Sequence, residues 1–91
     1  MILGKVTGSV VATRKNDKLL GSKFLIVEPL KSMASGEAGE KFVAVDSIGA
    51  GIGDIVMVAR GSAARLACDS KDAPCDAAVV GIIDDGTGLD V

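Results

Sequence analysis

The most constraining feature of this chain is a segment in which closely spaced glycines separate two apolar runs. It reads VAVDSIGAGIGDIVMVARGSAAR over residues 43–65, with Gly49, Gly51 and Gly53 alternating through its middle. The apolar runs on either side are rich in valine and isoleucine, which favour strands. So many glycines mark backbone that needs a positive φ or a close approach by another segment. The segment therefore predicts a strand, a glycine turn, a second strand and a short helix whose N-cap is Ser62.

Glycine-rich turns also bind phosphate groups, but the spacing here fits neither of the two best-defined patterns. A dinucleotide fingerprint needs glycines at relative positions one, three and six, at the start of a helix. The sixth position from Gly49 is Asp54, and residues that favour a strand follow it. A P-loop ending at Gly21-Ser22-Lys23 would need its first glycine where Asn16 stands. These glycines are better explained by a tight turn or a contact between subunits.

The composition indicates more apolar surface than one small core can hide. The 91 residues form a single domain, residues 1–91, and a chain of this size buries only about 60–65% of its unfolded surface. Yet 48% of the residues are hydrophobic, mean hydropathy is +0.44, and the only aromatic residues are Phe24 and Phe42. We expect part of the aliphatic surface to be covered by other subunits.

Charge and targeting signals exclude several classes of partner. The net charge is −2, no cluster of basic residues occurs, and tryptophan and tyrosine are absent. Binding of nucleic acid through phosphate neutralisation and base stacking is therefore poorly supported. The first residues lack the charged region and apolar core of a signal peptide, and no run approaches the length of a membrane span. We expect a cytoplasmic protein with neither a membrane nor a nucleic acid as partner.

The sequence supplies no catalytic group. Without histidine there is no ordinary triad and no proton shuttle near neutral pH. Ser62 lacks the G-x-S-x-G context of a nucleophile, because Arg60 stands two residues before it. The carboxylates that could collect a divalent cation do not have the spacing of a calcium loop; they are Asp69, Asp72, Asp76, Asp84 and Asp85. We expect no enzyme activity, no catalytic residue, no bound metal and no cofactor.

The two cysteines, Cys68 and Cys75, could form a pair, but they are expected to be reduced, structural and dispensable. Cytosolic proteins seldom keep disulfides, and carboxylates beside these thiols would raise their pKa and weaken them as nucleophiles. A zinc site would need four ligands, which a chain without histidine does not offer here.

The rest of the chain predicts five short strands. Apolar and polar residues alternate over residues 2–12, the clearest strand pattern in the sequence. Further strands are expected at residues 19–28, 41–46, 55–60 and 77–83, with the helix at 62–67 between the fourth and fifth. The second strand is apolar on both faces, so its outer face needs a cover. The segments 30–40 and 68–76 read as loops. This order fits a mainly β fold, a five-stranded OB-like barrel, although other five-stranded barrels remain open.

Four segments together resemble a known family, the EutN/CcmL family of bacterial microcompartment vertex proteins. They are MILGKVTGSVVAT with the following Lys15, Gly21-Ser22-Lys23 leading into FLIVEPL, the glycine-containing segment 43–65, and DAAVVGIID at residues 76–84. They occur in the expected order and cover about two-thirds of the chain, and the central segment is the most diagnostic.

The resemblance implies a structural protein that assembles as a homopentamer. Such rings cap the vertices of polyhedral shells, including carboxysomes, whose faces are tiled by hexameric shell proteins. It leaves open which enzymes are enclosed, and the two loops and the cysteines receive no role from it. The alternative is a small OB-type module that binds nucleic acid or a ligand.

Two sets of site residues follow. We expect a structural role for Asp46, Gly53 and Arg65, since either a charge pair or bonds from the carboxylate to the backbone could pin the glycine turn. A narrow pore on the five-fold axis needs small side chains. The candidates for its lining are Gly49, Ala50, Gly51, Gly61, Ser62 and Ala63, where the chain consists of glycine, alanine and serine.

Overall fold

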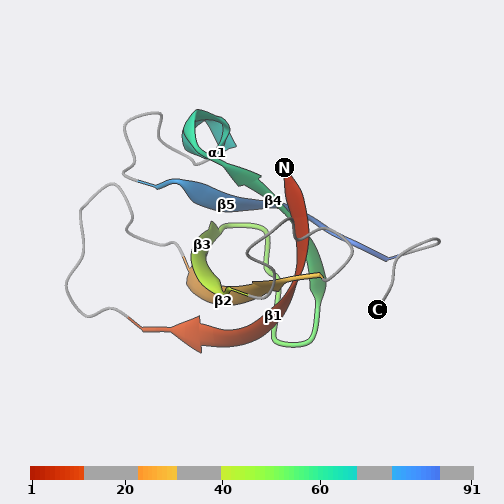
Figure 1. Ribbon diagram of the computed structural model, residues 1–91. Helices are drawn as coiled ribbons and strands as arrows, with labels where there is room; N and C mark the ends of the chain where they lie inside the picture. Colours follow the sequence, from red (N-terminus) through yellow and green to blue (C-terminus); the bar gives the residue numbers. More distant parts are fainter. Residues whose placement is uncertain (12–22, 31–39, 68–74, 85–91) are drawn as a thin grey trace.

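The computed structural model describes residues 1–11, 23–30, 40–67 and 75–84, which form a closed five-stranded barrel with one short helix (Figure 1). The elements in chain order are β1 (Ile2–Val10), β2 (Lys23–Pro29), β3 (Phe42–Asp46), β4 (Ile55–Arg60), α1 (Ser62–Ala67) and β5 (Ala77–Ile82). Around the barrel the strands follow the order β1-β2-β3-β5-β4. The predicted fold class, an OB-like barrel with the helix between the fourth and fifth strands, is confirmed.

Neighbouring strands pair antiparallel except at one seam. β3 and β5 run parallel, with Val45 opposite Ala78, and β1 pairs with both β2 and β4. The predicted strands agree with the observed ones within a few residues, although the predicted start at 19–22 and the residue at 12 lie outside the described residues. Pro29 is the last residue of β2, where the absence of a backbone N–H costs little stability. The next residue, Leu30, again bonds to β1, because its N–H donates to the Leu3 carbonyl oxygen.

The side chains of β2 are apolar on both faces of the strand, and the two faces have different surroundings. Leu25 and Val27 point into the barrel and are buried, whereas Ile26 lies on the outer face opposite Val43 of β3. Val43 is half exposed. The outer surface of the barrel is therefore apolar at this point, as expected of a chain with more aliphatic residues than its own core uses.

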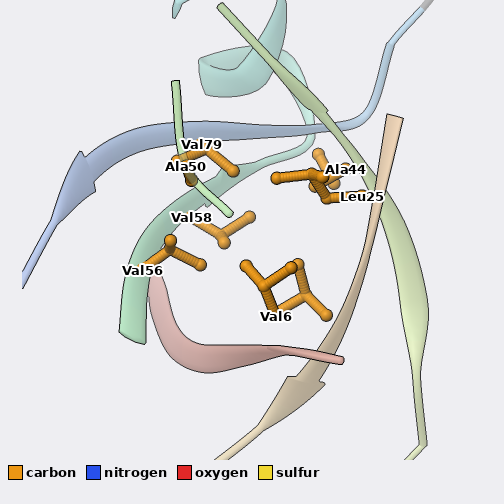
Figure 2. Packing of buried hydrophobic residues seen from close by; sticks show 9 residues of the cluster. Val6, Leu25, Ala44, Ala50, Val56, Val58 and Val79 are labelled. Carbon is orange, nitrogen blue, oxygen red and sulfur yellow. The ribbon is translucent and has the colours of Figure 1, made fainter. Parts of the chain in front are cut away.

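The barrel interior is filled by small and β-branched side chains (Figure 2). The cluster consists of Val6, Leu25, Val27, Ala44, Ala50, Val56, Val58, Ala77 and Val79. All the strands contribute, and Ala50 comes from the turn between β3 and β4. Valine and alanine suit a narrow barrel because opposite walls are close together, and each fully buried valine contributes roughly 1.5–3 kcal/mol.

Gly4 is where β1 passes closest to β2. A Cβ atom on Gly4 would lie 2.5 Å from Val27 Cγ1 and 2.9 Å from the Glu28 carbonyl oxygen, distances that real side chains do not adopt. At Gly8, beyond the bulge in β1, the nearest atom to such a Cβ would be Ile26 Cδ1 at 3.3 Å. Gly4 is therefore required by packing against the neighbouring backbone.

Cys75 overturns the prediction of free thiols, because it is disulfide-bonded. The only other cysteine in the chain is Cys68, which lies outside the described residues. The Cys75 sulfur lies 3.6 Å from the Ala64 carbonyl oxygen of α1. A disulfide sulfur has no proton to donate, so this is a packing contact. The prediction relied on the expected compartment, which does not decide whether a particular cysteine is bonded.

Loss of this disulfide should lower stability by about 2–3 kcal/mol, the chain-entropy value for closing a loop of roughly eight residues. The measurement is denaturant unfolding of the oxidised protein with and without a reductant. The Cys75→Ser variant is the control, because its unfolding midpoint should already be lowered and should no longer respond to the reductant. Equal midpoints for oxidised and reduced wild-type protein would contradict this expectation.

Candidate functional site

The candidate site is the glycine turn, defined here as residues 47–54 between β3 and β4. Its first half folds around the carboxylate of Asp46, which is only 1% exposed. Oδ1 accepts from Ile48 N–H at 2.9 Å and Oδ2 from Ala50 N–H at 2.8 Å. Gly49 N–H lies between the two oxygens, at 3.3 and 3.2 Å. One side chain thus satisfies three successive backbone donors, of which that of Ala50 is buried.

Lys23 at the start of β2 completes this arrangement. It stands opposite Asp46 in the register of β2 and β3, and its Nζ lies 3.8 Å from Asp46 Oδ2. The same ammonium donates to the Ala50 carbonyl oxygen at 3.0 Å. Because the Lys23 side chain is 57% exposed, solvent screens the ion pair, and the backbone donors supply most of the stabilisation of the carboxylate.

The second half of the turn is held by Asp54 and by β1. Asp54 Oδ2 accepts from Gly51 N–H at 2.8 Å, and Asp54 N–H donates to the Gly51 carbonyl oxygen at 3.0 Å. Gly53 N–H donates to the Val6 carbonyl oxygen, and Val6 N–H donates to that of Asp54, at 2.8 and 2.9 Å. Hydrogen bonds therefore fix the turn at both ends.

The glycines of this region differ in what they require. Gly49 has φ of 109° and Gly53 has φ of 97°, and Gly61, before α1, has φ of 64°. Side chains rarely adopt these values, so these three positions need glycine for conformation. Gly51 has no such φ, and the nearest atom to a Cβ there would be Asp54 Oδ2 at 3.9 Å. Nothing in the described chain requires glycine at position 51.

Ala50 must be withdrawn from the predicted pore lining. Its side chain is fully buried and belongs to the core cluster, next to residues such as Val79 (Figure 2). It closes one end of the barrel interior and does not face outward. A small side chain suits a narrow core as well as a crowded axis, and the sequence alone could not distinguish these two reasons.

The structure does not bring the two predicted glycine segments together. Gly49 and Gly51 precede β4, whereas Gly61, Ser62 and Ala63 follow it, and they lie toward opposite ends of that strand (Figure 1). Six residues of strand span about 20 Å. Ser62 and Ala63 are exposed at the start of α1.

The three residues predicted to have a structural role, Asp46, Gly53 and Arg65, do not all belong to the glycine turn. Asp46 and Gly53 belong to the hydrogen-bonded turn, so the backbone bonds of Asp46 are the interaction that pins it. Arg65 is an exposed residue of α1, and the ion pair recorded for Asp46 is with Lys23. Sequence reasoning missed Lys23 and Asp54 as parts of this site, although Lys23 stands in a segment singled out for its family resemblance.

Residues 1–11, 23–30, 40–67 and 75–84 contain neither a cluster of metal ligands nor a membrane-spanning helix. No group of three or more histidine, cysteine, aspartate or glutamate residues there could hold a metal ion. No helix within those ranges is long and apolar enough to cross a bilayer.

Comparison with known proteins identifies the family. The family model described as "Ethanolamine utilisation protein EutN/carboxysome" matches residues 1–84. The bacterial microcompartment shell vertex protein GrpN of Rhodospirillum rubrum is 48% identical over 84 residues, which cover 92% of this chain and 93% of GrpN.

Solved structures agree with the sequence match. The structure described as the GrpN pentameric microcompartment shell protein from Rhodospirillum rubrum superposes with a TM-score of 0.76 at 46% identity, covering 93% of this chain and 95% of that one. The pentameric shell protein MSM0273 from the RMM microcompartment gives a TM-score of 0.78 at 33% identity, covering 100% and 96%. The chain therefore belongs to the EutN/CcmL family.

Proposed function

We propose that this protein is a structural shell protein whose homopentamer caps the vertices of a bacterial microcompartment. The observation that carries the proposal is membership of a family whose similar members are named shell vertex proteins and include pentamers. Hexameric shell proteins are its proposed neighbours, because six-fold tiles alone make a flat sheet and five-fold points are needed to close it. The function is mechanical, and it uses no catalytic residue and no cofactor.

The surface of the single chain supports assembly. Large apolar side chains are exposed on several elements; within the described residues they are Met1, Val10, Val11, Val43, Ile48, Ile52 and Leu66. A closed ring needs two different surfaces on each copy, because each subunit contacts its two neighbours in a head-to-tail manner. Apolar residues on both the barrel face and the turn are consistent with that requirement.

The pore on the five-fold axis remains part of the proposal. Because the two glycine segments lie at opposite ends of β4, a single constriction can use only one of them. We assign it to Gly61, Ser62 and Ala63, whose exposed small side chains allow five copies to meet. Gly49 and Gly51 are the alternative lining. A structure of the ring decides between them by which segment approaches the axis.

The proposal predicts a stable pentamer of about 45 kDa, five times the 9.1 kDa chain, in native mass spectrometry at micromolar concentration. Sedimentation equilibrium provides the independent check, since it measures mass without transfer to the gas phase. A monomer, particularly one that binds single-stranded oligonucleotides, would contradict the proposal and support a small OB-type binding module instead.

A further inference from the structure

We infer that the glycine turn, residues 47–54, is a contact between adjacent subunits, buried against a second copy of this chain. The inference rests on the proposed homopentamer and names one surface that forms it. It starts from two isoleucines in the turn: Ile48 is 48% exposed and Ile52 is 69% exposed. Both stand in a segment that hydrogen bonds fix at each end, so the turn cannot fold inward to hide them.

The rigidity of the turn makes it a suitable docking surface. A mobile loop would lose conformational entropy on binding, whereas this turn is already ordered by the Asp46 carboxylate and by its bonds to β1. Exposing two large aliphatic side chains on an ordered turn is unfavourable in water. It becomes favourable when a partner covers them.

Gly51 provides the second, independent observation. Gly49 and Gly53 are required by their positive φ, but Gly51 has an ordinary φ and open space where a Cβ would stand. A residue without a side chain also allows close approach by other backbone. Among the described residues the atom nearest to such a Cβ is Asp54 Oδ2 at 3.9 Å, so the open side of Gly51 is accessible to a neighbouring copy.

The charges of the turn indicate the kind of partner. Asp46 is buried and bonded within the turn, and Asp54 accepts from Gly51, so both carboxylates have partners within their own chain. The large side chains that the turn presents outward are the aliphatic ones of Ile48 and Ile52, beside glycines and the small polar Ser47. An apolar protein surface matches it, and the pentameric relatives supply the occupant: a neighbouring copy. Bulky isoleucines packed between neighbours also leave the start of α1 as the better pore lining.

The test compares Ile52→Glu with Ile52→Leu as the matched control. Sedimentation equilibrium of Ile52→Glu should show the concentration for half-assembly raised at least tenfold, because each interface would bury an unpaired carboxylate, whereas Ile52→Leu should assemble like wild type. The far-UV circular dichroism of the Ile52→Glu monomer should remain that of a folded β protein. Wild-type assembly by Ile52→Glu overturns the inference.

Gly51→Ala is the second variant, and it answers the question if Ile52→Glu does not fold. Within its own chain the added methyl group meets no atom closer than 3.9 Å, so stability of the subunit should be unchanged while assembly weakens several-fold. Unchanged assembly of a folded Gly51→Ala removes that residue from the contact. If wild-type protein itself is monomeric, the proposed pentamer fails, which is a different result from a wild-type ring that Ile52→Glu still forms.

Discussion

Replacing Asp46 by alanine should lower the free energy of unfolding by about 3 kcal/mol, because it removes hydrogen bonds from backbone donors to a charged group. The carboxylate accepts from the N–H groups of Ile48, Gly49 and Ala50, and alanine leaves all three without that partner at the end of the barrel. Equilibrium denaturation in urea measures the change. Because the turn also carries the proposed subunit contact, assembly should weaken in the same variant.

Two controls separate the backbone bonds from the ion pair. Asp46→Asn keeps the shape and one acceptor oxygen but faces an NH₂ group toward a backbone donor, so it should fall between wild type and alanine. Lys23→Met removes the ammonium, whose side chain is 57% exposed, and should cost under about 1 kcal/mol. An Asp46→Ala protein that unfolds at the wild-type midpoint would show that the carboxylate does not hold the turn.

The Gly4→Ala substitution should destabilise the barrel by about 2–3 kcal/mol, because it inserts a methyl group where no space exists. The new Cβ would lie 2.5 Å from Val27 Cγ1 and 2.9 Å from a backbone oxygen of β2, so β1 and β2 must move apart. Thermal unfolding followed by circular dichroism measures the effect.

Gly8→Ala is the matched control in the same strand. The nearest atom to its Cβ would be Ile26 Cδ1 at 3.3 Å, the flexible end of that side chain, and the other Ile26 atoms lie at 3.8 and 3.9 Å, an ordinary contact. We expect a change under about 1 kcal/mol, because the lower entropy of the unfolded chain offsets part of the cost. Equal losses for the two variants would mean that the cost reflects glycine in a strand generally and not the close approach at Gly4.

The order of strands and the short helix could be predicted because their signals are local. Valine-rich runs mark the strands, and Gly61 followed by Ser62 marks the passage from β4 to α1, where the structure has a φ of 64°. The hydrogen bonds of Asp46 could also be predicted, as one of two alternatives beside a charge pair. An aspartate at the start of a turn often accepts hydrogen bonds from the backbone N–H groups that follow it.

What could not be predicted depends on three-dimensional pairing. Lys23 reaches Asp46 only because β2 and β3 place them opposite each other, a register that single residues do not encode. Ala50 was misassigned because a core and an axis both favour small side chains. The bonding of Cys75 depends on how the folded chain places it, which composition does not report.

The parallel seam between β3 and β5 has a consequence for the time at which a ring can begin to form. Val45 and Ala78 are neighbours in the barrel although 33 residues separate them in the sequence. Pairings this distant in the sequence slow folding because a long loop must close first. During synthesis, β5 leaves the ribosome only after β3, β4 and α1, so the barrel stays open until then. We therefore expect subunits to associate after translation of β5, as whole barrels and not as nascent chains.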